Sequence, residues 1–107
     1  MNTLPLTEAV LLILLSLADQ PRHGYSILQD VERMSNGRVK LSTGTLYGAL
    51  RRLLREGWIE QFEEDESPRG RKAYRLTSAG RRNLRQEVDR MKQLTKLAGL
   101  RVARKEA

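Results

Sequence analysis

Apolar residues recur at three- and four-residue steps along most of the chain, a spacing that predicts amphipathic helices. Residues 8–19 are apolar on nearly every side, which predicts a helix that is buried on most sides, with Thr7 as its N-cap. Residues 23–35 and 42–56 each carry one apolar stripe and one polar side. Ser42 and Thr43 both suit the N-cap of the second of these helices, and Gly57 suits its C-terminal end. A long helix begins near residue 78, and Gly99 is the point where we expect it to end or bend.

A different pattern separates the third and fourth helical segments. Trp58, Ile59 and Phe62 predict a strand, and Tyr74 and Leu76 predict a strand that returns beside it. The segment between them is polar, with a proline and a glycine at its tip, as in the loop of a β-hairpin. The predicted fold is therefore mainly α with a two-stranded β-hairpin, in the order helix, helix, helix, hairpin, long helix.

This order of elements is that of a winged helix-turn-helix, in which the third helix reads DNA and the hairpin is the wing. We expect residues 1–76 to form the DNA-binding domain. Residues 77–107 are then a C-terminal dimerisation helix that packs with it as one compact unit.

The composition narrows the chemistry that such a fold could carry. The chain has 107 residues, no cysteine and one histidine, which excludes disulfides, thiol nucleophiles, thiolate metal sites and histidine-rich metal sites. No acid and nucleophile are paired, so we expect no enzyme, no metal and no cofactor. The longest apolar run, residues 9–15, is far below the roughly 20 residues that span a bilayer, and no signal peptide precedes it. We therefore expect a cytoplasmic protein with no membrane contact.

The positive charge is concentrated in the last third of the chain. Residues 1–66 hold 7 Lys/Arg and 10 Asp/Glu, whereas residues 67–107 hold 13 and 3, for a total net charge of +7. A basic surplus gathered in one part of a small domain suggests a polyanion or another acidic surface as the partner.

The third helical segment carries the first set of candidate DNA contacts. Its inward stripe is Leu46, Ala49, Leu50 and Leu53. Two outer rows follow at four-residue steps: Thr43, Tyr47 and Arg51 in one row, and Gly44, Gly48 and Arg52 in the other. The hydroxyls of Ser42, Thr43 and Thr45 and the free amides of the first turn are suited to phosphate, and an arginine can meet a phosphate or a guanine edge.

A serine cap and solvated arginines would give similar residue types without any partner. The two glycines favour the DNA interpretation, because glycine in a helix costs up to about 1 kcal/mol relative to alanine. A close approach of the backbone to DNA would compensate for that cost.

The wing tip is the second candidate contact, with the cations Arg69, Arg71 and Lys72. The acidic run Glu63 to Glu66 precedes it and would repel phosphate, so we expect the run on the far side or on the rising flank of the hairpin. The same run favours an alternative function, a winged-helix protein-interaction module that binds an acidic protein partner. His23 could cap its helix or touch a phosphate, and capping is the simpler role.

The last helix carries a heptad-like seam. Successive seam positions step by 4, 3, 4, 3 and 4 residues, which predicts a coiled-coil interface between two copies of the chain: Leu84, Val88, Met91, Thr95, Ala98 and Val102. Leu94 widens this apolar stripe. We expect its basic residues to line the outer faces of this interface; contact with DNA is the alternative. The residues expected at the homodimer interface are Leu11 in the first helix and Leu84, Val88, Met91, Leu94 and Ala98 in the last.

Three segments together resemble the PadR-type transcriptional regulators: HGYSILQDV, GTLYGALRRLLREGWIE and SPRGRKAYRLTSAGRRNL. The resemblance covers roughly residues 4–90. It implies a homodimeric regulator of the short branch of that family, usually a repressor, which binds double-stranded operator DNA. It also implies that Tyr47 contacts the DNA.

Two departures from the family pattern qualify the resemblance. The position after the recognition-helix tyrosine is often proline and is Gly48 here. Some small members bind flat aromatic drugs between tryptophans of the last helix, and this chain has its only tryptophan at position 58. An unknown small-molecule effector remains open, but we do not expect a drug pocket of that kind.

Overall fold

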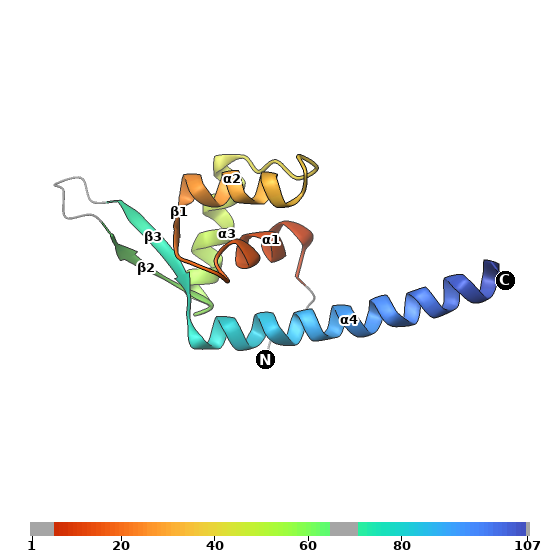
Figure 1. Ribbon diagram of the computed structural model, residues 1–107. Coiled ribbons are helices and arrows are strands. Elements are labelled where there is room, and N and C mark those ends of the chain that lie inside the picture. The colour runs from red at the N-terminus through yellow and green to blue at the C-terminus, as the bar shows by residue number, and fades with distance from the viewer. Residues whose placement is uncertain (1–5, 65–70, 107) are drawn as a thin grey trace.

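The computed structural model describes residues 6–64 and 71–106, and these form three packed helices, a small sheet and a long helix that extends beyond the rest (Figure 1). The predicted order of helices and hairpin is confirmed. The elements are α1 (Glu8–Ser16), β1 (Arg22–His23), α2 (Gly24–Met34), α3 (Thr43–Arg55), β2 (Ile59–Glu63), β3 (Lys72–Leu76) and α4 (Ser78–Glu106).

The helix ends follow from their capping residues. The Thr7 hydroxyl accepts from the Val10 amide at 3.2 Å, and the Ser42 hydroxyl accepts from the Thr45 amide at 3.1 Å, so both predicted N-caps are confirmed. Gly57 follows α3 with a φ of 78°, a backbone conformation that glycine adopts without strain. These caps set where α3 starts and stops, and therefore which of its residues face outward.

The sheet has three strands rather than the two that were predicted, in the order β1-β3-β2. The added strand, β1, pairs Arg22 with Tyr74 and His23 with Ala73. Two residues are too few to display an alternating pattern, which explains why the sequence did not predict this strand. Trp58 is also outside β2, in the turn that follows α3.

The core lies where the three helices meet the inner face of the sheet. The predicted inward stripe of α3 is confirmed, since Leu46, Leu50 and Leu53 are at most 3% exposed and Ala49 is partly buried against them. The other fully buried large side chains come from α1, α2 and the turn after α1: Ile13, Leu14, Leu17, Ile27 and Val31. The position of α3 is thus fixed by its own apolar stripe.

A largely buried arginine joins β1 to the two helices beside it. The Nε of Arg22 donates to the Ser16 carbonyl at 2.7 Å, and its guanidinium lies 3.6 Å from the carboxylate of Asp30 in α2. Asp30 also accepts from Arg33 at 2.8 Å. Because every charge in this group has a partner, its burial is compatible with a stable fold, whereas removal of one partner would leave a buried charge unpaired.

Helix α4 starts against the turn that ends α3. The Thr77 amide donates to the Trp58 carbonyl at 3.0 Å, and the Thr77 hydroxyl donates to the Gly57 carbonyl at 2.6 Å. Gly80 then passes so close that a Cβ placed on it would lie 1.9 Å from the Trp58 carbonyl oxygen. The helix continues through Gly99, so the predicted break there is wrong, and its second half projects away from the other elements (Figure 1).

Candidate nucleic-acid interface

Helix α3 has two different flanks on either side of its outward face. One flank, which includes Tyr47, lies against the start of α2. The other, which includes Gly48 and Arg52, borders a cavity. Both flanks and the outward face between them include residues that we expected to meet DNA.

The Tyr47 side chain occupies a space that is free only because residue 24 is glycine. A Cβ on Gly24 would be 2.2 Å from the Tyr47 hydroxyl oxygen, so the tyrosine ring packs directly on the first turn of α2. It remains 40% exposed. Tyr47 therefore fixes α3 against α2 while still presenting part of its ring to solvent.

A second tyrosine extends this polar region toward the wing. Tyr74 in β3 accepts a hydrogen bond from the Gln61 side chain at 3.3 Å. Burial raises the pKa of the Tyr74 hydroxyl, the nearby Tyr47 acts in the same direction, and the bond from Gln61 opposes them. The Tyr74 hydroxyl thus lies near Tyr47, between α3 and the hairpin.

The glycines of α3 are open on the outside. A Cβ on Gly44 or Gly48 would have no heavy atom closer than 4.0 Å. No contact inside the chain therefore requires glycine at these positions, in contrast to Gly24 and Gly80. Ser42, Thr43 and Thr45 are all exposed at the start of the same helix, with the Ser42 hydroxyl engaged as the cap.

Arg51 and Arg52 of α3 differ in their surroundings. The Arg52 Nε donates to the Glu56 carboxylate at 3.2 Å on the same helix. Arg51 is exposed and makes no ion pair with any acidic side chain of residues 6–64 and 71–106. Of the two, Arg51 has the side chain that is available to a new anionic partner.

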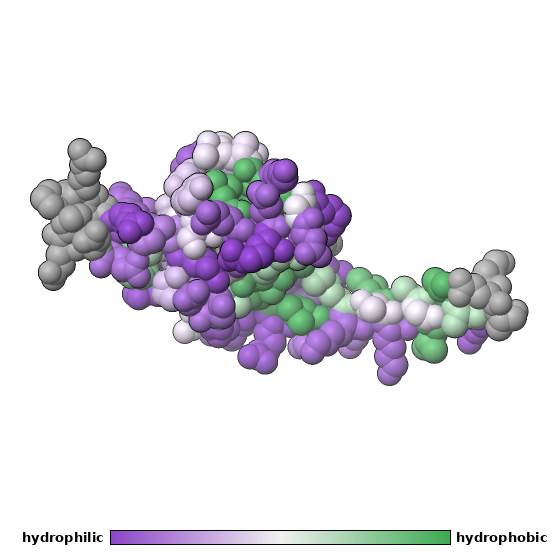
Figure 2. Space-filling model, turned by 45° about the horizontal axis from the view of Figure 1, so that its top comes forward, coloured by the Kyte–Doolittle hydropathy of each residue, from purple (hydrophilic) through white to green (hydrophobic). Residues whose placement is uncertain are grey.

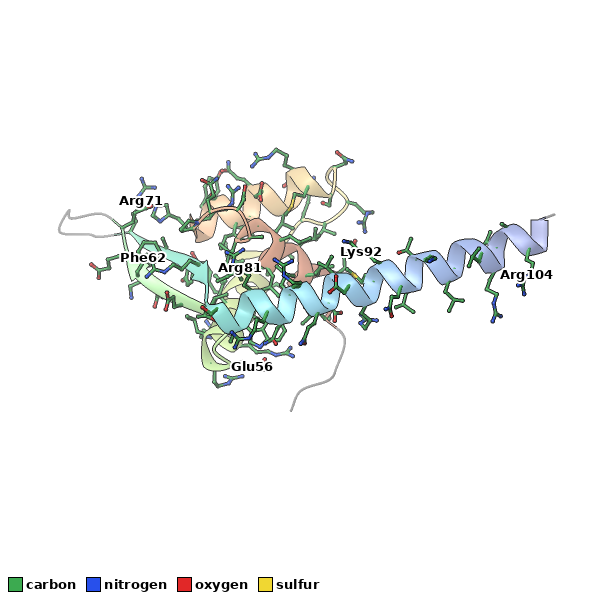
Figure 3. The ribbon with its side chains drawn as sticks, turned by 60° about the horizontal axis from the view of Figure 1, so that its bottom comes forward. Glu56, Phe62, Arg71, Arg81, Lys92 and Arg104 are labelled. Carbon is green, nitrogen blue, oxygen red and sulfur yellow. The ribbon has the colours of Figure 1, made fainter. Side chains whose placement is uncertain are left out.

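The wing presents its cations near the far end of the hairpin. Arg71 and Lys72 are both exposed, and Figure 3 shows Arg71 at the end of the described hairpin, away from α4. Arg69 lies outside the described residues. Nearer the base, the Arg75 guanidinium stacks 4.4 Å from the centre of the Phe62 ring and also bonds Glu60 at 2.6 Å, so this arginine is occupied.

The described half of the acidic run lies on the hairpin flank. Glu63 is the register partner of Lys72 across the hairpin. The Glu64 carboxylate lies 2.6 Å from Nε2 of His23. His23 occupies the N-cap position of α2 but its side chain makes no capping hydrogen bond, so the simpler role that we predicted for it is wrong. Asp65 and Glu66 lie outside the described residues.

With this geometry in hand, comparison with known proteins gives the family. Residues 13–86 match the model of the transcriptional regulator PadR-like family. The chain belongs to this family. A 37.1 kDa protein of unknown function from transposon TN4556 of Streptomyces fradiae is 40% identical over 88 residues, which are 82% of this chain but only 24% of that protein. The chain thus spans about a quarter of that relative.

Solved PadR-family structures share the fold. A PadR family transcription regulator from Clostridium difficile matches with a TM-score of 0.76 and 24% identity over 90% of this chain and 99% of that one. Bacillus subtilis PadR, solved in complex with operator DNA, matches with a TM-score of 0.68 and 22% identity over 78% of this chain and 48% of that one. PadR-family regulators therefore include a member whose DNA complex has been observed directly.

The expected interface residues of this PadR-family chain fall into two groups. Leu84 is only 5% exposed and belongs to the core of its own chain. Val88 and Leu11 are partly buried and pack against that core. Met91 is partly buried, and Leu94 and Ala98 are exposed. Figure 2 shows apolar surface in the angle between the helical body and α4 that continues in patches along the projecting helix.

A cavity of about 170 Å³ lies beside α3. Its lining is mainly apolar, with Trp58 at one side and the Arg52–Glu56 pair on the helix, and Gly48 contributes backbone. A cavity of this size and lining can hold a small apolar ring. The lining residues are Leu6, Val10, Gly48, Ala49, Arg52, Leu53, Glu56 and Trp58.

Two further features are absent from residues 6–64 and 71–106. No helix there is both long enough and apolar enough to cross a membrane. No group of three or more His, Asp or Glu side chains among those residues is placed to hold a metal ion.

Proposed function

We propose that this PadR-family regulator is a homodimeric repressor that binds a pseudo-palindromic operator. The observation that carries the proposal is the exposed surface of α3, which holds two glycines without close neighbours, the partly exposed Tyr47, and Arg51, which makes no ion pair with the described acidic side chains. Each copy would insert α3 into a major groove, and the wing would contact the adjacent backbone. A twofold homodimer implies half-sites about one helical turn apart.

The exposed part of α4 supports the homodimer. Four large apolar side chains beyond Met91 are between 49% and 60% exposed, which is unusual for a helix that stays in water alone. A second copy of the same helix would cover Val102 in the predicted seam and Leu94 beside it. The four are Leu94, Leu97, Leu100 and Val102.

The proposal is tested by selection of bound duplexes from a random DNA pool, followed by footprinting at several salt concentrations. A symmetric selected sequence and an affinity that falls with salt are expected, because phosphate contacts release counterions. If no sequence is enriched over the starting pool, the regulator is not an operator-binding repressor.

Arg51→Ala is expected to weaken binding to the selected operator by about 1–3 kcal/mol, the usual contribution of an arginine that reads a base. Arg52→Ala should have a smaller effect, since Arg52 already bonds Glu56. Fluorescence anisotropy with labelled operator measures both. Equal losses for the two variants would contradict the assignment of Arg51 as the main arginine contact.

Gly48→Ala separates stability from DNA contact. Because a Cβ there has open space, the change should raise the free energy of unfolding by about 0.5–1 kcal/mol, the difference in helix propensity. It should also weaken operator binding, if the helix backbone approaches a phosphate at this point. Gly99→Ala is the matched control, since it lies in a helix with open space around it and far from α3. An affinity unchanged in both variants would argue against the close approach.

A further inference from the structure

We propose that His23 is a wing-positioning residue, which in its protonated form bonds both strands of the hairpin and so strengthens DNA binding at lower pH. The proposal rests on the proposed function, since it concerns how the wing is held for DNA. His23 contributes no contact to DNA in this scheme. It acts through the hairpin.

The geometry places an acceptor at each ring nitrogen. Nε2 of His23 lies 2.6 Å from the Glu64 carboxylate, and Nδ1 lies 3.3 Å from the Lys72 main-chain carbonyl. A carboxylate and a carbonyl accept hydrogen bonds, and a neutral imidazole has only one N–H to donate. Both contacts are therefore satisfied together only when the ring carries two protons and a positive charge.

Because of the position of His23, these two bonds can hold the hairpin against the rest of the domain. Glu64 directly follows β2, and Lys72 begins β3, so the ring joins the two strands just below the hairpin tip. His23 itself is the residue before α2, and β1, to which it belongs, pairs with β3 through only two residues. The ring thus ties the hairpin to the helix-turn-helix at a place where the backbone pairing is short.

The other charged groups near this site are already paired or lie on another side. On the same face of the sheet, Arg75 of β3 and Glu60 of β2 bond each other at 2.6 Å. Since side chains alternate along a strand, Tyr74 and the side chain of Lys72 lie on the opposite face, with Glu63 as the partner of Lys72 in register. On β1, the neighbouring Arg22 is bonded to Asp30.

Two groups on adjoining segments complete the surroundings. Tyr25 in α2 is 70% exposed. Arg71, before β3, is exposed, and its main-chain carbonyl accepts from the Glu64 amide at 3.1 Å. Among the described residues, Glu64 is therefore the one acidic group in contact with His23.

The sign of the pH effect follows from this arrangement. When the ring is protonated and Glu64 is ionised, both bonds form and the hairpin is held. When the ring is neutral, one of its nitrogens carries no proton. That nitrogen then faces the oxygen of Glu64 or of Lys72 without a hydrogen bond. Operator affinity should therefore be higher at the lower pH, where both bonds form.

The test compares operator affinity of the full chain at pH 5.5 and pH 8 at one ionic strength. For the unmodified protein we expect an affinity loss about fivefold greater than for His23→Gln, which cannot gain a charge. Glu64→Gln should resemble His23→Gln, because it removes the ionised acceptor. Glu63→Gln is the matched control and should keep the full pH response, since Glu63 does not contact the ring.

An NMR measurement without DNA separates failure of this inference from failure of the proposed function. Between pH 5.5 and pH 8, the amide signals of Glu64 and Ala73 should move in the unmodified protein and stay in place in His23→Gln. A pH response of affinity that is the same in the unmodified protein and in His23→Gln overturns the inference and leaves the repressor intact. If the amide shifts depend on His23 but the protein selects no DNA sequence, the hairpin bonds are supported and the proposed repressor function is contradicted.

Discussion

Gly80→Ala is expected to lower the free energy of unfolding by about 3 kcal/mol, the upper part of the range for forcing an atom into a packed site. The added Cβ would lie 1.9 Å from the Trp58 carbonyl oxygen, which is main chain and already accepts from the Thr77 amide. Neither the turn nor the helix can move aside without loss of that hydrogen bond. Urea unfolding followed by circular dichroism measures the change.

Gly99→Ala is the control for Gly80→Ala because both are glycines of α4. A Cβ on Gly99 meets no atom within 4 Å, so that variant should be as stable as the unmodified protein or slightly more stable. If Gly80→Ala unfolds at the same urea concentration as Gly99→Ala, the close contact between α4 and the Trp58 turn is not present in solution.

The double variant Leu94→Glu with Ala98→Glu is expected to be monomeric and to bind operator at least about 100-fold more weakly. Burial of two carboxylates in an apolar interface is strongly unfavourable without partners, and a monomer loses the second half-site that raises affinity through its effective concentration. Light scattering measures the assembly state, and fluorescence anisotropy measures the affinity.

A charge-matched control uses the opposite side of the same helix. Gln86→Glu with Gln93→Glu adds the same two charges at exposed positions outside the seam, and should leave both assembly and affinity nearly unchanged. A dimer that survives the Leu94 and Ala98 changes would place the interface elsewhere.

The parts of this fold that local chemistry determines could be predicted from the sequence. The Ser42 cap, the inward stripe through Leu46 and Leu50, and the C-terminal glycine of α3 are each set by neighbouring residues, and all are confirmed. The hairpin was predicted for the same reason, because alternating residues flank a polar turn.

The missed features depend on contacts between distant residues. Strand β1 exists because Arg22 and His23 meet β3, about 50 residues later in the chain. The sequence offered His23 as a cap, but its partners are Glu64 and Lys72. Gly99 was expected to interrupt α4, yet a single glycine costs only about 1 kcal/mol in a helix and the neighbouring turns sustain it.

In the candidate site, too, some features could be predicted from the sequence and others could not. Periodicity placed Tyr47 and Arg51 on the outer side of α3, but gave no sign that Tyr47 packs on Gly24. Leu84 fitted the heptad spacing, yet the structure uses it in the core of its own chain. A seam in the sequence does not distinguish a surface that meets a partner from one that meets the same chain.

The contact at Gly80 also has a mechanical meaning. Helix α4 has 29 residues and is about 43 Å long at about 1.5 Å per residue. A tilt of about 5° at its start would carry its far end through about 4 Å, which exceeds the rise of one base pair, about 3.4 Å. In the proposed homodimer, the close crossing of α4 over the Trp58 turn, which only a glycine at position 80 permits, would therefore help to set the distance between the two DNA-binding halves.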